Sequence, residues 1–239
     1  TCFTCHRTTY NPENVPSLAA QYAVLTDDPN AMTIFPDKEK TVDQVFNKYM
    51  QALGGADRVA RLTSYTAKGS YEGFNTGGGA VPVEIFAKAP NQRTQIVHAP
   101  DGDSVKTFDG RAAWTAEGWR PLPLLPMTGG NLSGMKFDAI VAFPAGIRAA
   151  FAKWAVGSAT IDEKPVTVLQ GTNPGELPIN LYFDESGLLV RSVRWNKTLV
   201  GTVPTQIDYS NYKDAAGVKV PYHVLMTWTD GQNTFEFTE

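Results

Sequence analysis

The first residues of the chain carry the side chains whose types and spacing could do chemistry. Two residues separate Cys2 from Cys5, and His6 follows the second cysteine directly. Two thiols at this spacing can add to the two vinyl groups of one porphyrin, and the adjacent histidine is then held beneath the iron as an axial ligand. The chain has only these 2 cysteines, so no other thiol competes for the pairing. The pattern predicts covalent attachment of a c-type haem through Cys2 and Cys5, with His6 on the iron.

Three other uses of the two cysteines fit the sequence less well. A disulfide between Cys2 and Cys5 would close a very small, strained ring. A thioredoxin-type redox pair belongs near a βαβ pattern, and none follows here. A zinc site needs about four ligands, whereas the other histidines, His98 and His223, lie far along the chain.

The sixth iron ligand has several candidates. A thioether or an imidazole can complete the coordination of a haem iron. Met32 lies in the stretch nearest the haem motif, which makes it the first candidate. Met50 falls on the apolar face of an expected helix, where a core position is more typical. His98 and His223 lie in strand-like runs, where a lone histidine is more often a strand or edge residue. The other methionines are Met127, Met135 and Met226.

Composition and charge exclude several classes of protein. Hydrophobic residues make up 42% of the 239 residues, which is enough for a substantial core in one or two domains. The formal net charge of −3 gives no basic footprint, so no nucleic-acid partner is expected. No apolar run approaches the length of a membrane span, and no hydrolase constellation is convincing. The sequence therefore indicates an electron carrier rather than an enzyme, without a transmembrane segment.

Proline and turn residues divide the chain into two regions. Residues 1–40 hold the haem motif and then closely spaced prolines, which predicts an irregular haem-bearing segment and connector. Almost no chain precedes the motif, and residues 234–239 alternate like a strand up to the last residue. We therefore expect the C-terminal part of a longer cytochrome, cut at both ends. Because haem c is attached outside the cytoplasmic membrane, the expected location is the periplasm or cell surface of a bacterium.

The second region, residues 41–239, opens with an amphipathic helix. Thr41 is a good N-cap, and Gln44 completes a capping box. Apolar residues then recur three and four positions apart as far as Leu53, and Gly54 and Gly55 end the helix. A short second helix is expected over 56–62.

From residue 64 the hydrophobic period changes to two, which predicts strands joined by short turns. A proline- and glycine-rich break is expected over 121–134, followed by a helical stretch over 136–153 that is kinked at Pro144. Because local turns join successive strands, the sheet is expected to be antiparallel. The expected strands, about twelve in all, are 64–73, 81–89, 93–99, 104–109, 112–116, 155–162, 166–171, 179–183, 188–195, 205–212, 223–228 and 234–237.

The predicted fold class is α+β, with a curved antiparallel sheet or incomplete barrel wrapped around helices that cover its inner face. Apolar surface between the sheet and the helices would border a ligand site. We expect Phe46 and Met50, together with inward Trp or Phe residues of the strands, to line it. The alternative is a fully packed core with no room for a ligand.

Three further groups of residues carry structural expectations. The glycine run 77–79 lacks the context of a phosphate loop and is expected at a hairpin tip. The tryptophans could line a cavity, but a core position is the more usual one; they are Trp114, Trp119, Trp154, Trp195 and Trp228. Charged strand residues at alternate positions are expected on a solvated face; they are Glu84, Arg93, Arg191 and Arg194.

The run from Thr1 to Arg7 resembles the last haem motif of the photosynthetic reaction centre cytochrome c subunit family. The resemblance implies electron transfer through a covalently bound haem, with redox proteins as partners. In that family a methionine on a helix preceding each motif supplies the sixth iron ligand. This sequence has no residues at that place, so the resemblance assigns no sixth ligand.

Residues 41–239 resemble the outer-membrane lipoprotein-sorting, or LolA-like, domain that is often fused behind such a cytochrome. The resemblance implies a half-barrel with helices as a lid, and better-known members hold acyl chains in the concave face. Because a fold alone does not transfer a function, a periplasmic carrier for lipid or another hydrophobic ligand is the alternative to electron transfer. The stretches that carry the resemblance are 49–55, 86–91, 108–110, 181–184, 187–191 and 218–222.

Overall fold

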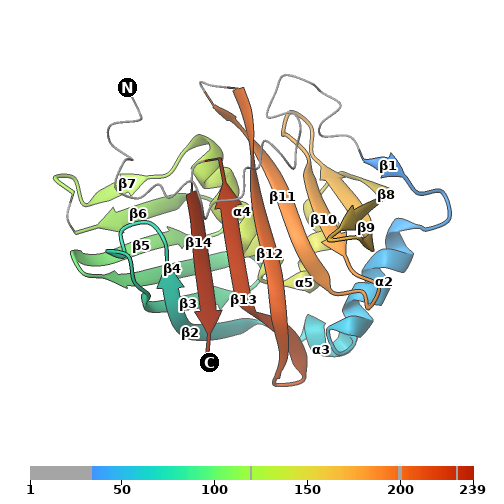
Figure 1. The fold of residues 1–239 in the computed structure, drawn as a ribbon, viewed down its shortest axis with the longest axis horizontal. Coiled ribbons are helices and arrows are strands. Elements are labelled where there is room, and N and C mark those ends of the chain that lie inside the picture. Colours follow the sequence, from blue (N-terminus) through green and yellow to red (C-terminus); the bar gives the residue numbers. More distant parts are fainter. Residues whose placement is uncertain (1–33, 119, 199–200, 230) are drawn as a thin grey trace.

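The computed structural model describes residues 34–118, 120–198, 201–229 and 231–239. Helices α2 (Val42–Ala52) and α3 (Ala56–Ala60) precede a first run of strands. Helices α4 (Gly129–Val141) and α5 (Pro144–Ile147), followed by a short 3-10 helix, separate that run from a second one (Figure 1). The strands are β1 (Phe35–Pro36), β2 (Ser64–Glu72), β3 (Val81–Lys88), β4 (Gln92–Ala99), β5 (Gly102–Phe108), β6 (Ala113–Glu117), β7 (Leu124–Pro126), β8 (Lys153–Ile161), β9 (Lys164–Thr172), β10 (Ile179–Phe183), β11 (Leu189–Thr198), β12 (Gly201–Ala215), β13 (Val218–Trp228) and β14 (Gly231–Phe237).

The described strands form one open antiparallel sheet of 14 strands, in the order β1-β8-β9-β10-β11-β12-β13-β14-β2-β3-β4-β5-β6-β7. It consists of two meanders, β2 to β7 and β8 to β14, in which neighbours in the chain pair with one another. The pairing of β14 with β2 joins them, with Phe235 opposite Tyr71 and Phe237 opposite Gly69. The curved antiparallel sheet is therefore confirmed. The two strands beyond the expected twelve are β1 and β7, which are too short to show alternation and lie at the two edges.

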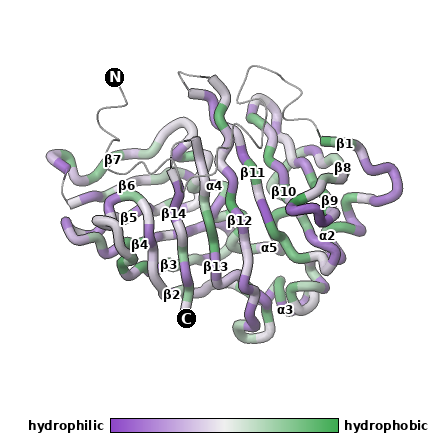
Figure 2. The backbone as a smooth tube through the Cα atoms, viewed as in Figure 1, coloured by the Kyte–Doolittle hydropathy of each residue, from purple (hydrophilic) through white to green (hydrophobic). Residues whose placement is uncertain are grey.

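The sheet bends strongly, so that β12 to β14 run across the direction of β3 to β7 (Figure 1). Helix α4 lies in the concave side and contacts β4, β5 and β6 as well as β11. Helix α2 covers β8 and β9 at the other end of the sheet. Figure 2 shows hydrophobic and hydrophilic residues interleaved along the strands, as expected for a sheet with one face toward a core and one toward water.

Helix α2 begins and ends where the sequence predicts. The Thr41 side chain accepts a hydrogen bond from the Gln44 backbone amide, and the Gln44 side chain accepts one from the Thr41 amide. These reciprocal bonds satisfy two of the amides that a helix start leaves without partners. Gly54 and Gly55 follow with φ of +119° and +105°, a backbone conformation that glycine adopts without strain. A Cβ at Gly54 would also lie 2.4 Å from the carbonyl oxygen of Gly217, so only glycine fits there.

Helix α4 starts earlier than the sequence predicts. The expected helical stretch began at residue 136, whereas α4 begins at Gly129, inside the expected break. Two glycines at a helix start look like a loop because glycine disfavours helix, and packing against the sheet outweighs that preference. The expected interruption at Pro144 is confirmed, because α4 ends before it and Pro144 opens α5.

The main core lies between α2 and the strands of the second meander. Leu169 and Leu181 are fully buried there, and the Phe46 and Trp154 rings meet edge to face with centroids 5.0 Å apart. Phe137 of α4 and Ile147 of α5 complete the same cluster. Two smaller clusters lie under the first meander. The long helices thus serve as the inner layer that a curved sheet of this size requires.

The last part of the expected connector lies on the sheet. Phe35 and Pro36 form β1 and pair with Ser158 and Gly157 of β8. The division into a haem segment (1–40) and a second domain (41–239) stays a prediction, since most of the first region lies outside the described residues.

Candidate functional site

The predicted haem residues Cys2, Cys5 and His6, and the candidate ligand Met32, lie outside the residues that the structure describes. Haem attachment, its iron ligands and the redox role therefore stay predictions. In the described part of the chain, no group of 3 or more His, Cys, Asp or Glu side chains is placed to hold a metal ion. None of the described helices is long and apolar enough to cross a membrane.

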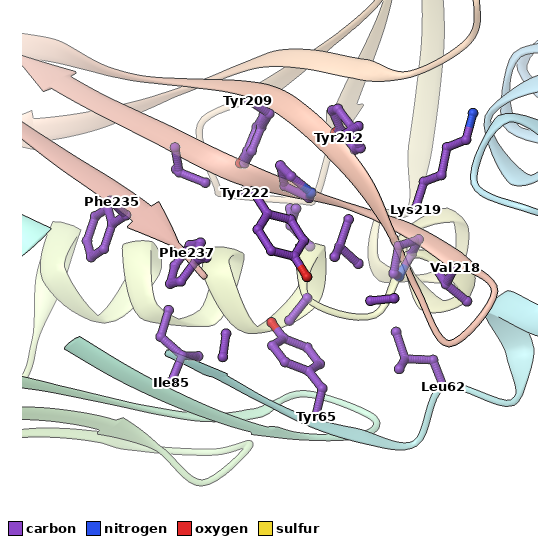
Figure 3. A pocket seen from close by; sticks show the side chains of 18 of the residues that line it. Leu62, Tyr65, Ile85, Tyr209, Tyr212, Val218, Lys219, Tyr222, Phe235 and Phe237 are labelled. Atoms are coloured by element: carbon purple, nitrogen blue, oxygen red, sulfur yellow. The ribbon is translucent and has the colours of Figure 1, made fainter. Parts of the chain in front are cut away.

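A cavity of about 380 Å³ lies between the concave face and the helices (Figure 3). This volume falls within the range of about 300–1,000 Å³ that is typical of sites for small ligands. Most of its lining is apolar. The walls come from helices α2 and α4 and from strands of both meanders, with Tyr49, Leu53, Ile85, Val141, Val224, Phe235 and Phe237 among the lining side chains.

Strand alternation explains how the lining is assembled. Tyr65 and Ala67 point into the cavity from β2, and Ile85 lies opposite Ala67 on β3. On the other side of the β14–β2 junction, Phe235 and Phe237 point inward from β14. Because successive strand residues face opposite sides of a sheet, these positions share one face, and the junction of the two meanders lies in the middle of the cavity wall.

The predicted lining is confirmed only in part. The inward strand Phe residues are present as Phe235 and Phe237, but Phe46 and Met50 do not line the cavity. Helix α2 is rotated so that Tyr49 and Leu53 face the cavity, while Phe46 packs on Trp154. No tryptophan among the described residues lines the cavity. Trp195 is buried and Trp154 packs, partly buried, against the main core, so the core position is confirmed for these two.

Tyrosines supply the polar edges of the lining, with 5 of them around the cavity. The hydroxyl groups of Tyr65 and Tyr222 point toward one another across it (Figure 3). Tyr212 donates a hydrogen bond to the Leu189 carbonyl at 2.6 Å, and Tyr209 shares one with Ser192 at 3.1 Å. Burial raises the pKa of Tyr49, Tyr209 and Tyr212 above the usual value, because the phenolate would be poorly solvated there. The cavity therefore carries neutral hydroxyls at ordinary pH.

Charged side chains gather where α4 crosses β4 and β5. Lys106 lies opposite Gln95 on the inner face, and burial lowers its pKa, while the charges of Glu117 and Asp138 act in the other direction. Burial also lowers the pKa of Arg194, again opposed by the charge of Asp138. Asp138 of α4 thus faces basic side chains from both meanders.

The prediction of a solvated face is wrong for Arg93 and Arg194. Arg93 lines the cavity, and Arg194 lies against α4, where a Cβ at Gly134 would be 2.6 Å from its Nη2 atom. Glycine at this helix position therefore makes room for the guanidinium group. Glu84 and Arg191 do lie on the convex face, where they pair with Lys68 and Asp208, but their side chains are only 27% and 18% exposed. The alternation of residues along a strand assigns them to two faces of the sheet, but it does not determine which face is concave.

The two described histidines lie in strands, as predicted, and their side chains are on the convex face. His98 Nδ1 is 2.8 Å from Asp103 Oδ1 and its Nε2 is 3.7 Å from Glu84 Oε2. His223 pairs with Glu236 of the neighbouring strand. Neither one lines the cavity.

A second hollow of about 730 Å³ lies beside the start of α2 and the ends of β8 and β9. Lys40 and Lys48 line it together with Glu39, Asp184 and Glu185. Mixed charges at exposed positions are typical of solvated surface. The tyrosine-lined cavity is therefore the stronger candidate for a ligand site.

Neither a protein-family model nor a curated protein sequence matches the chain. Solved structures match its fold. A LolA superfamily protein from Nitrosomonas europaea is similar with a TM-score of 0.52 and 11% identity, over 84% of this chain and 92% of that one. A DUF1329 family protein from Desulfovibrio piger is similar with a TM-score of 0.50 and 10% identity, over 83% of this chain and 91% of that one. At these identities the likeness shows the fold alone, and the fold is LolA-like.

Proposed function

We propose that residues 41–239 hold a hydrophobic ligand in the cavity between the sheet and the helices, as a carrier or scaffold module of the bacterial cell envelope. The cavity of about 380 Å³ with its mostly apolar lining is the observation that carries this proposal. Protein interiors are normally packed without voids of this size, and an apolar hollow of ligand size usually receives a ligand. The location in the envelope rests on the LolA-like fold and on the haem motif.

Nile red, a neutral dye that fluoresces in apolar surroundings, tests this proposal directly. Ala67 lines the cavity from β2, so Ala67→Phe should fill it and weaken dye binding by about tenfold or more. Ala116→Phe on β6 is the matched control. Ala116 does not line the cavity, and it points to the other face of the sheet from its buried neighbour Glu117. Dye binding that is absent, or that Ala67→Phe leaves unchanged, would contradict the ligand-holding function.

A second candidate function rests on a separate observation, the spacing of Cys2, Cys5 and His6. We propose that the chain also carries a covalent haem c there and exchanges electrons with redox partner proteins. The two thiols would hold the porphyrin, His6 would be an axial ligand, and Met32 is the proposed sixth ligand. When bound, the haem would supply one-electron chemistry.

Covalent attachment is tested by extraction and by spectra. Acid–acetone should leave the haem on the protein, and the pyridine haemochrome spectrum should show thioether-linked haem. Replacing both Cys2 and Cys5 with Ala should abolish the signal while Nile red binding persists. Haem that extracts freely from the unmutated protein would contradict the proposal.

A further inference from the structure

The mostly apolar lining of the cavity is interrupted on β2 and β4 by a polar site, made of Arg93, Tyr65 and Gln95. Arg93 on β4 and Tyr65 on β2 lie on either side of Ala87 on β3, since Ala87 is opposite both of them. The backbones of β2 and β4 are therefore about 10 Å apart, a distance that two long side chains can span over one small residue. Burial raises the pKa of Tyr65, and the nearby positive charge of Arg93 lowers it. Arg93, Tyr65 and Gln95 thus lie close together on the wall that β2 and β4 contribute to the cavity.

The Arg93 guanidinium has hydrogen-bonding capacity to spare. Its Nη1 and Nη2 atoms each lie 3.4 Å from the same acceptor, Oε1 of Gln95. A guanidinium has five N–H donors, and 3.4 Å is at the long end for a hydrogen bond. Among the described residues, no ion pair joins Arg93 to a carboxylate. Arg93 is therefore placed to receive an acceptor group of a ligand.

The charge balance around this polar site favours an anion. Arg120 and Glu117 pair at 2.9 Å, which leaves that pair neutral. Asp138 then faces Lys106 and Arg194, whose pKa values it raises against the effect of burial. Lys106, Arg194, Arg93 and Arg120 thus share two carboxylates, Glu117 and Asp138, around the polar site. Lys219 and Glu239 also line the cavity and contribute one charge of each sign.

The rest of the cavity suits a hydrocarbon chain. Leu62, Val224, Phe235 and Phe237 give it apolar walls, and its volume of about 380 Å³ lies in the lower part of the range for ligand sites. A single chain matches that volume better than the several chains of a membrane lipid. The cavity thus combines mostly apolar walls with one cationic polar site.

We propose that the ligand is a single-chain anionic amphiphile, such as a long-chain carboxylate, whose head is bound by Arg93 with Gln95 and Tyr65 while its chain lies along the apolar wall. This inference rests on the proposed ligand-holding function and specifies its ligand. A hydrogen bond between a guanidinium and a carboxylate in a partly buried site is among the stronger ones in proteins. The head group would therefore add both affinity and a fixed orientation of the chain.

The test compares three probes of equal chain length by their displacement of Nile red: hexadecanoate, hexadecanol and hexadecyltrimethylammonium. Hexadecanoate should bind the unmutated protein about tenfold more tightly than hexadecanol. Arg93→Gln should remove that preference, Arg93→Lys should restore part of it, and hexadecanol should bind all variants alike, which also shows that they are folded. Arg191→Gln, a guanidinium of the convex face paired with Asp208, is the matched control and should change nothing.

The outcomes separate this inference from the function on which it rests. Equal binding of hexadecanoate and hexadecanol, unaffected by Arg93→Gln, would overturn the anionic head group and leave the hydrophobic carrier intact. Tighter binding of the ammonium probe would show that Asp138 governs the polar site and would overturn the inference in the opposite direction. If none of the probes displaces Nile red, and the dye itself does not bind, the carrier function fails as well.

Discussion

The two halves of the concave face have the same kind of strands but different contents. Over β9 and β10, Leu169 and Leu181 are fully buried under α2 and the adjoining helices. Over β2 to β4, Tyr65, Arg93 and Gln95 line a cavity. The first half is packed like an ordinary core, whereas the second keeps empty space and charge. The difference indicates that stability is concentrated over β9 and β10, and that ligand binding belongs to the space that runs from Tyr49 and Leu53 at the end of α2 to β2 and β4.

The helices explain the difference. Helix α2 presents Val45, Phe46 and Tyr49 to the sheet, so it fills the space beneath it. Helix α4 instead turns Gly134 and Asp138 toward the sheet. Gly134 leaves room for the Arg194 guanidinium, and Asp138 faces basic groups. A helix that turns a glycine and a carboxylate toward the sheet fills the space less completely than an amphipathic helix that turns only apolar and aromatic residues toward it.

The largest expected effect is on the packed half. Leu181→Ala removes a fully buried side chain and should lower the free energy of unfolding by about 3–5 kcal/mol. Ile85→Ala, which borders the existing cavity, should cost about half as much because its side chain has fewer neighbours to lose. Urea denaturation of both variants measures the two costs. Equal losses would show that the cavity half is as tightly packed as the other.

Enlarging a side chain should destabilise the packed half and not the cavity half. Ala139 is fully buried in α4, so Ala139→Leu should overpack the core and cost about 1–3 kcal/mol. Ala67→Leu places the same extra carbons in the cavity and should leave stability nearly unchanged or slightly higher. The free energies of unfolding of the two variants decide the matter. A large loss in Ala67→Leu would mean that the cavity is not open to a side chain.

Charges on the two faces should also differ in their contribution. Asp138→Asn leaves Lys106 and Arg194 without their shared carboxylate and should cost about 1–3 kcal/mol. Glu84→Gln on the convex face removes a partner of Lys68, whose side chain is 52% exposed. Exposed pairs contribute about 0–1 kcal/mol, so that variant should melt close to the unmutated protein. A stability gain in Asp138→Asn would show that Asp138 does not stabilise the buried Lys106 and Arg194.

The smallest effect at neutral pH concerns the tyrosines. Burial raises the pKa of Tyr71 to about 12, and raises those of Tyr49 and Tyr209 as well. In the unfolded chain these phenols ionise near pH 10, so above that pH the unfolded state loses protons first. Stability should therefore be constant up to about pH 10 and fall between about pH 10 and 12. Tyrosinate absorbance should rise in a late, cooperative step that coincides with unfolding; a gradual rise without unfolding would show that the rings are accessible to water.

Local sequence determined much of the framework. The capping box at Thr41 and Gln44 and the glycines after Leu53 delimit α2 because they act within one turn of chain. Alternation located most of the long strands, and short turns between them made the sheet antiparallel. The spacing of Cys2, Cys5 and His6 likewise predicts haem without reference to any fold.

Other features were decided only by tertiary structure. The pairing of β14 with β2 joins segments at opposite ends of the second region, and no local signal specifies it. Helix α4 forms through its glycine start because the curved sheet needs an inner layer there. Alternation placed Arg93 and Arg194 on one face of their strands, but the curvature of the whole sheet made that face the inside. The period of two in the sequence distinguishes the two faces of each strand. Only the curving of the sheet around its helices determines which face surrounds the cavity.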